Sequence, residues 1–230
     1  MKSVWQETAL PRFPRLDGDV RTDVLIIGGG IAGILTAYFL HRSGIPYIFV
    51  EKNRICGENT QNTTAKITVQ NGLIYQKILR SGGEDAAKQY YRANNAAFEK
   101  YAELCRDIRC DYERKDNFVY SDDLRKLDKE MDALQKIGCR AELCRELPLP
   151  IKPAGAVKVP DQAQFNPLKF LAEITEGLHI YENTFVREMI GCTAVTDRGR
   201  ITADRVVCAT HFPFINKHGG YFLKLYQSRS

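Results

Sequence analysis

Three glycines form the Gly-x-Gly-x-x-Gly pattern of a phosphate-binding turn: Gly28, Gly30 and Gly33. They directly follow the apolar run 23–27 and open an apolar-periodic stretch that begins at Ile31. In such a turn the first glycine permits a tight bend and the second lets the backbone approach a pyrophosphate. The third lets the helix pack closely on the strand. The amides of Ile31 and Ala32 would then face phosphates at the positive end of the helix dipole.

An acidic residue stands where the ribose of a dinucleotide would need it. Glu51 ends the second apolar run, 47–50, and follows Gly33 by 18 residues. A carboxylate at this place accepts hydrogen bonds from ribose hydroxyls. FAD and nicotinamide cofactors share this adenylate half, so these residues alone leave the choice between them open.

The elements around the turn form a strand–helix–strand unit. The runs 23–27 and 47–50 are typical of strands buried on both faces, and 31–43 has helical periodicity that ends at Gly44. Such a unit implies a parallel sheet and an α/β fold. Farther along we expect helices over 84–108, 124–137 and 167–176. We expect strands over 118–120, 156–159, 178–181, 184–190 and 205–209, and a hairpin around 197–199.

Residues 23–33 resemble the opening of the FAD-dependent amine and amino-acid oxidoreductases, the group of glycine oxidase, sarcosine oxidase and D-amino-acid oxidase. The lead-in from Trp5 to Asp19 resembles a bacterial subgroup that often carries a C-terminal Rieske iron–sulfur domain. The resemblance implies a doubly wound, parallel-sheet, Rossmann-like FAD-binding domain with an inserted α+β cap or substrate region. The expected FAD-binding segments are 1–83 and 151–230, and the expected cap is 84–150.

The resemblance also implies which residues hold FAD. In this family a stretch rich in Gly, Ser, Thr and Asn follows the acid and wraps the pyrophosphate and flavin, and 57–66 fills that place. Val186 takes the position of a valine whose backbone meets the adenine. Residues 203–210 resemble the strand before an Ala-Thr-Gly turn, with His211 replacing that glycine. The expected cofactor-binding residues are Gly28, Gly30, Ile31, Ala32, Gly33, Glu51, Lys52, Asn59, Thr60, Thr63, Thr64, Ala65, Lys66, Val186, Ala209 and Thr210.

Other reactive side chains point less clearly to chemistry. The pairs Cys105–Cys110 and Cys139–Cys144 are spaced more widely than most zinc pairs and have no histidine nearby, so we expect no metal site. Cys56 is expected to be an ordinary thiol. His211 and Lys66 are candidates for contact with the cofactor or substrate. We assign no catalytic residue, because the family's substrate contacts lie mostly in the final segment of its members.

Composition excludes several classes of function. The net charge of +5 is spread along the chain without a polybasic arm, so no nucleic-acid partner is expected. No run of about 18 apolar residues predicts a membrane span, and the N-terminus lacks the apolar centre of a signal peptide. Seven cysteines without such a signal are typical of reduced thiols, so we expect a cytoplasmic protein.

The reaction implied by the resemblance is hydride transfer from a small amine or amino-acid-like donor to the flavin. Members of the family run considerably longer, so we expect this chain to be the N-terminal, truncated portion of such an enzyme. The apolar stretch 221–226 would then favour self-association or a missing C-terminal partner segment. The alternative is a catalytically inactive fragment that binds FAD weakly or not at all.

Overall fold

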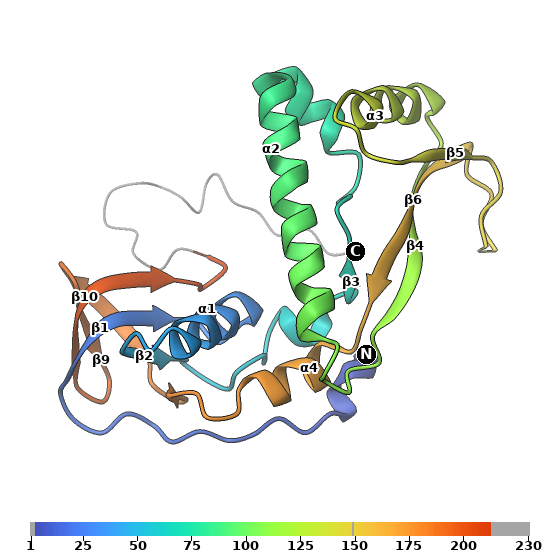
Figure 1. The fold of residues 1–230 in the computed structure, drawn as a ribbon. Helices are drawn as coiled ribbons and strands as arrows, with labels where there is room; N and C mark the ends of the chain where they lie inside the picture. Colours follow the sequence, from blue (N-terminus) through green and yellow to red (C-terminus); the bar gives the residue numbers. More distant parts are fainter. Residues whose placement is uncertain (1–2, 149, 213–230) are drawn as a thin grey trace. The chain divides into compact units, whose positions relative to one another are not determined.

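The computed structural model describes residues 3–148 and 150–212, and the chain forms two compact units (Figure 1). Unit 1 comprises Met1–Thr63 with Pro167–Ser230, and unit 2 comprises Thr64–Asn166. The inserted unit is therefore longer at both ends than the expected 84–150. Residues 64–83 and 151–166, which the sequence placed with the FAD-binding segments, belong to unit 2 by their contacts. Pro213, Phe214 and the apolar stretch 221–226 lie outside the described residues.

Unit 1 is built on a six-stranded sheet with the order β7-β2-β1-β10-β9-β8. Its strands are β1 (Val20–Ile27), β2 (Tyr47–Val50), β7 (Ile180–Tyr181), β8 (Val186–Ile190), β9 (Thr193–Thr196) and β10 (Arg200–Cys208). β1 pairs in parallel with both β2 and β10, and β2 with β7, whereas β8, β9 and β10 form an antiparallel meander. The expected α/β fold with a parallel sheet is confirmed. The second strand of the expected hairpin and the expected strand 205–209 form one long strand, β10.

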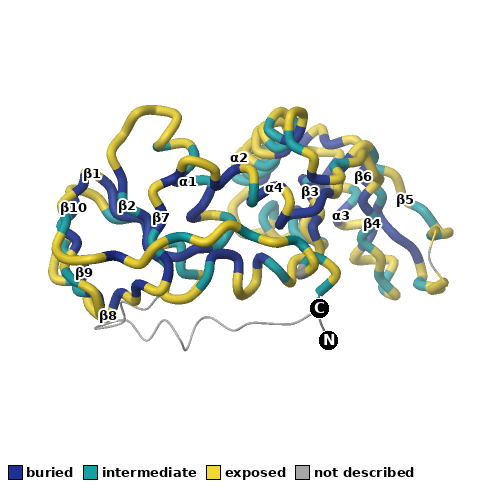
Figure 2. Tube along the Cα trace, turned by 90° about the horizontal axis from the view of Figure 1, so that it is seen from below, coloured by how far each residue is buried: buried dark blue, intermediate teal, exposed yellow. Residues whose placement is uncertain are grey.

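Helix α1 (Ile31–Arg42) follows β1 directly and contacts β1, β2 and helix α4 (Pro167–Ile174). Unit 1 also contains two short 3-10 helices, η1 (Val4–Glu7) and η2 (Thr60–Asn62). The end of β1 is buried at successive positions, which requires cover on both faces of the strand (Figure 2). The helix covers one of these faces, where Phe49 lies against Gly33.

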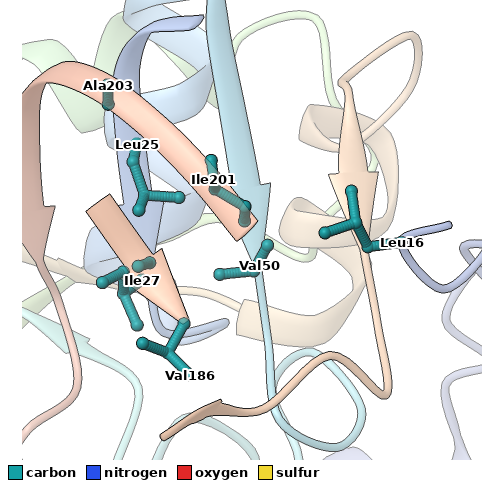
Figure 3. Packing of buried hydrophobic residues seen from close by; sticks show 8 residues of the cluster. Leu16, Leu25, Ile27, Val50, Val186, Ile201 and Ala203 are labelled. Atoms are coloured by element: carbon teal, nitrogen blue, oxygen red, sulfur yellow. The ribbon is translucent and has the colours of Figure 1, made fainter. Parts of the chain in front are cut away.

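A cluster of buried apolar side chains joins the parallel strands to the antiparallel meander (Figure 3). Leu25, Ile27 and Val50 from β1 and β2 pack with residues of the three meander strands. The other members are Leu16, Val186, Ala194, Ile201 and Ala203. Burying each large aliphatic side chain stabilises the fold by about 1.5–3 kcal/mol. The cluster therefore holds the carboxyl ends of β1 and β2 in fixed positions.

Unit 2 combines two helices with an antiparallel sheet of the order β3-β6-β4, in which β5 also pairs with β6. Its elements are β3 (Lys66–Ile67), α2 (Tyr75–Leu104), β4 (Glu113–Ser121), α3 (Leu124–Lys136), β5 (Glu142–Cys144) and β6 (Gly155–Gln164). The backbone of α2 leaves helical geometry at Gly83, with φ of 78°. The expected helix 84–108 is the longer part of α2. It ends at Leu104, and the preceding turns before Gly83 were not expected.

A buried carboxylate of α3 holds the first turn of α2. Glu130 is fully buried and accepts hydrogen bonds from the backbone amides of Tyr75 at 3.1 Å and Gln76 at 2.9 Å. These amides have no partner within their own helix, and Ile74 offers no capping side chain. Burial raises the pKa of Glu130 although both amides favour its charged form. Glu130 of α3 thus caps the N-terminus of α2.

Among the residues that the structure describes, we find no helix with the length and hydropathy needed to cross a membrane.

Candidate functional site

Unit 1 contains a cavity of about 660 Å³ at the carboxyl ends of β1, β2 and β10. It is lined by residues 27–32, 50–52, 54, 56–60, 184–186 and 208–212. Ligands of open α/β sheets bind beyond this edge of the strands. The volume lies within the range of about 300–1,000 Å³ that is typical of small-molecule sites. The cavity is therefore the candidate cofactor site.

The first glycine of the turn allows β1 to meet β10 at the cavity. Gly28 has a φ of 112°, and its amide donates to the carbonyl of Val50 at 2.9 Å. A Cβ atom at this position would lie only 2.6 Å from the carbonyl oxygen of Ala209. Both the backbone angle and the close contact exclude larger residues.

The other two glycines have different surroundings. A Cβ atom on Gly33 would collide with the carbonyl oxygen of Gly28 and approach the ring of Phe49 to 3.3 Å, so Gly33 serves helix packing. A Cβ atom on Gly30 would have the hydroxyl of Thr60 as its nearest neighbour, at 3.5 Å. The space beside Gly30 is therefore open within the protein and is part of the cavity.

The N-terminus of α1 faces this space. The amides of the first turn of a helix lack partners within the helix, and they carry the positive end of its dipole. Gly30, which precedes the helix, has no side chain to cap them, and the amide of Ile31 donates to Thr60 Oγ1 at 3.2 Å. Ile31 and Ala32 both line the cavity. This end of the helix can attract an anion such as a phosphate.

Glu51 lies beside the glycine turn and is tied to it. Its Oε2 accepts from the amide of Gly29 at 2.6 Å, and its Oε1 accepts from the amide of Asn53 at 2.8 Å. A carboxylate has about four acceptor sites, so these bonds leave acceptors for hydroxyl donors. The next residue, Lys52, forms an ion pair with Glu58 at 2.8 Å, and this hydrogen bond raises the pKa of Lys52.

A tight turn after β10 completes the wall. Phe212 donates its amide to the carbonyl of Thr210 at 2.6 Å, so the turn spans three residues. His211 at its centre has a φ of 61°, the left-handed conformation that a glycine would adopt without strain. Histidine at this position therefore adopts a backbone conformation that favours glycine. Ala209 precedes this turn, and its amide donates to the carbonyl of Ile27 at 2.8 Å.

The cavity brings together most of the residues predicted from sequence. Those that line it are Gly28, Gly30, Ile31, Ala32, Glu51, Lys52, Asn59, Thr60, Val186, Ala209 and Thr210. Gly33 lies beneath the turn, and the carbonyl of Thr63 accepts from the indole nitrogen of Trp5 at 2.9 Å. Thr64, Ala65 and Lys66 belong to unit 2, and their cofactor role stays a prediction from sequence. Ala65 is buried there with a φ of 58°.

Sequence reasoning missed an ion pair at the cavity wall. Arg54 lines the cavity, and its Nη1 lies 2.6 Å from Oε2 of Glu182, which is fully buried. Glu182 directly follows β7, as Glu51 directly follows the neighbouring parallel strand β2. An acid after a short apolar strand is the signal that could have identified it.

The thiol in the cavity wall is not poised for reaction. Cys56 is buried, and burial, together with the charges of Glu182 and Glu51, raises its pKa to about 12. A thiol with such a pKa is protonated at neutral pH and is a poor nucleophile. This agrees with the expectation of an ordinary thiol.

Comparison with known proteins identifies the family. The sequence model of the family described as FAD dependent oxidoreductase (DAO) matches residues 23–228. The chain belongs to this DAO family. FAD is the cofactor of the family, so the prediction of FAD rather than a nicotinamide cofactor is confirmed at the level of the family.

A relative of this DAO chain is about twice as long. The chain is 34% identical over 244 residues to YhfW of Bacillus subtilis (strain 168), which is named as a Rieske 2Fe-2S iron–sulfur protein. The alignment covers 100% of this chain and 48% of YhfW. The predicted likeness to the Rieske-associated subgroup is thereby confirmed.

Solved structures share the fold. Glycine oxidase from Bacillus cereus ATCC 14579 is 25% identical with a TM-score of 0.59, over 83% of this chain and 55% of that protein. L-proline dehydrogenase from P. horikoshii is 18% identical with a TM-score of 0.67, over 86% of this chain and 54% of that protein. The chain thus spans about half the length of the relatives it matches.

Proposed function

We propose that this chain forms the nucleotide-binding part of an FAD-dependent oxidoreductase that takes a hydride from a small amine or amino-acid-like donor. The observation that carries the proposal is the cavity in which the N-terminus of α1, the open space at Gly30 and the carboxylate of Glu51 lie together. The name of the glycine oxidase neighbour supports the class of donor. FAD supplies the hydride acceptor when bound, and the residues of the chain bind and orient it.

The pyrophosphate is proposed to meet the start of α1. The amide of Ala32 offers a donor there, and the open space at Gly30 lets an anion approach the backbone. The hydroxyl of Thr60 accepts from Ile31 and keeps its own hydrogen to donate to a phosphate oxygen. A side chain at Gly30 would fill the same space, so the residues present fit a pyrophosphate.

The adenosine half is proposed to lie toward β2 and β8. Glu51 has acceptors left for ribose hydroxyls, and its two backbone donors fix the orientation of the carboxylate. Val186 lies buried in the cavity wall beside Phe185, whose ring is partly exposed. An exposed ring and a buried aliphatic side chain offer the apolar surface that an adenine requires.

The absorption spectrum of the purified protein tests the cofactor directly. We expect a bound flavin that denaturation releases, and chromatography should identify the released compound as FAD. The variant Gly30→Val is the control, because it should fold and lose the flavin. Tightly bound NAD(P) without flavin, or no affinity for added FAD, would overturn the proposal.

The class of donor is tested separately in the flavin-loaded protein. Glycine, sarcosine, proline and D-amino acids are added without oxygen, and bleaching of the flavin absorption reports hydride transfer. We expect at least one amine to bleach the flavin. If dithionite reduces the flavin but no amine does, the donor class is wrong while FAD binding stands.

A further inference from the structure

The N-terminal residues of unit 1 contact the loop that lines the cavity. We define residues 5–16 as the N-terminal strap and residues 53–63 as the cofactor loop. At one end of the strap, the indole nitrogen of Trp5 donates to the carbonyl of Thr63 at 2.9 Å. At its middle, the carbonyl of Pro11 accepts from Nη2 of Arg54 at 3.0 Å. The strap therefore holds the cofactor loop near both of its ends.

The far end of the strap is anchored in the core of unit 1. Leu16 is buried in the apolar cluster, and its amide donates to Thr184 Oγ1 at 3.0 Å. The carbonyl of Pro14 accepts from the amide of Glu182 at 2.9 Å. These bonds tie the strap to the segment after β7, which also contributes to the cavity wall.

Glu182 joins the strap to the cofactor loop. Its side chain is fully buried and accepts from three donors: the amide of Phe13 at 3.2 Å, Nη1 of Arg54 at 2.6 Å and the amide of Ile55 at 2.8 Å. A buried carboxylate is tolerated only when it is paired and hydrogen-bonded in this way. Oε2 accepts from Phe13 of the strap and from Arg54 of the cofactor loop, and Oε1 accepts from Ile55 of the same loop.

The cofactor loop in turn carries groups that the proposed site needs. The amide of Cys56 donates to the carbonyl of Gly29, and Thr60 accepts from the start of α1. A loop without support would lose conformational entropy when the cofactor orders its residues. A loop that is already ordered avoids this cost, and affinity rises accordingly.

We propose that the N-terminal strap and Glu182 hold the cofactor loop in its binding shape, which makes Glu182 a positioning residue for the cofactor. The inference rests on the proposed function for the identity of that cofactor. The bracing of the loop is a property of the protein without cofactor, so it can be tested on its own.

The decisive variant is Glu182→Gln, which keeps the size of the side chain and replaces one acceptor oxygen by a donor. At least one of the three donors then faces another donor. We expect the Kd for FAD to rise by about tenfold or more, because the loss of a charge-assisted hydrogen bond leaves the cofactor loop less ordered before FAD binds. The matched control is Asp204→Asn, because Asp204 pairs with Arg21 on an exposed surface at 3.1 Å. Its Kd should equal that of the wild type.

Hydrogen exchange of the cofactor-free protein separates bracing from general stability. In Glu182→Gln we expect faster exchange in residues 53–63 and unchanged protection in β1. Equal exchange in the loop would overturn the inference, as would an unchanged Kd. If the wild type binds no FAD, the proposed function fails, and the exchange result still decides the bracing.

A second variant covers the case in which Glu182→Gln does not fold. Trp5→Phe keeps an aromatic ring, removes the indole N–H that donates to Thr63, and leaves Glu182 and its three donors in place. We expect faster exchange near Thr63 and a Kd for FAD raised about twofold to fivefold. Unchanged exchange and an unchanged Kd in this variant would contradict the role of the strap.

Discussion

Substitution by alanine is expected to affect different properties at two positions of the glycine turn that are three residues apart. At Gly33 the Cβ atom of an alanine would collide with the backbone carbonyl of Gly28, which cannot rotate away. At Gly30 the same atom would stand 3.5 Å from Thr60 Oγ1, an ordinary contact, in a backbone conformation open to any residue. We therefore expect Gly33→Ala to weaken the fold and Gly30→Ala to weaken cofactor binding.

The magnitudes follow from the surroundings. Overpacking typically costs about 1–3 kcal/mol, and a collision with backbone lies at the upper end, while alanine regains about 1 kcal/mol of helix propensity. For Gly33→Ala we expect a loss of about 2 kcal/mol, which lowers Tm by roughly 4–8 °C. In Gly30→Ala, alanine lowers the conformational entropy of the unfolded chain, which stabilises the fold by about 0.4–1 kcal/mol. Alanine is also a poorer helix cap than glycine, and this costs a similar amount, so the two effects offset each other. The Tm of this variant should stay within about 2–4 °C of the wild type.

Two measurements on each variant test this contrast. Thermal unfolding without cofactor, followed by circular dichroism, reports the fold, and quenching of flavin fluorescence during titration reports the Kd for FAD. Gly30→Ala should raise the Kd at least about tenfold, a change of about 1.4 kcal/mol. Gly30→Val should abolish binding. Wild-type flavin retention in Gly30→Val, or wild-type stability in Gly33→Ala, would refute the reasoning.

Three further predictions concern the walls of the cavity. Glu51→Gln should weaken FAD binding by about 1–3 kcal/mol in a titration of the cofactor-free protein, because charge-assisted bonds to ribose are lost; an unchanged Kd would mean that Glu51 does not bind the ribose. His211→Val should lower the free energy of unfolding by about 1 kcal/mol, because valine does not tolerate the positive φ at this position. His211→Asn should leave it unchanged, because asparagine does tolerate that angle. Equal stability of both variants would contradict the strained turn. Iodoacetamide at pH 8 should modify the exposed Cys192 and spare the buried Cys56. The pKa of Cys56, about 12, keeps its thiol protonated until the pH approaches that value. Early modification of Cys56, detected by mass spectrometry, would contradict this.

The sequence by itself determined the elements whose signals are local. The apolar runs at β1 and β2, the periodicity of α1 and the spacing of Gly28, Gly30 and Gly33 all lie within 29 consecutive residues, 23–51. Their period and order report which faces are buried and where a turn must fall. They therefore predicted the strand–helix–strand unit and the part of the cavity lining formed by Gly28, Gly30, Ile31, Ala32 and Glu51. The same local signals placed Glu51 at the end of β2.

Only the tertiary structure decided the contacts between distant segments. Glu182 binds Arg54, which is 128 residues away in the sequence, and Phe13, which is 169 residues away. In unit 2, Glu130 caps α2 by binding Tyr75, which is 55 residues away in the sequence. The boundary of the inserted unit at Thr64–Asn166 also depends on such contacts. Periodicity shows which face of an element is buried and not what it is buried against, because that depends on the path of the whole chain. A buried carboxylate with three donors is therefore visible only once the strands and the strap lie side by side.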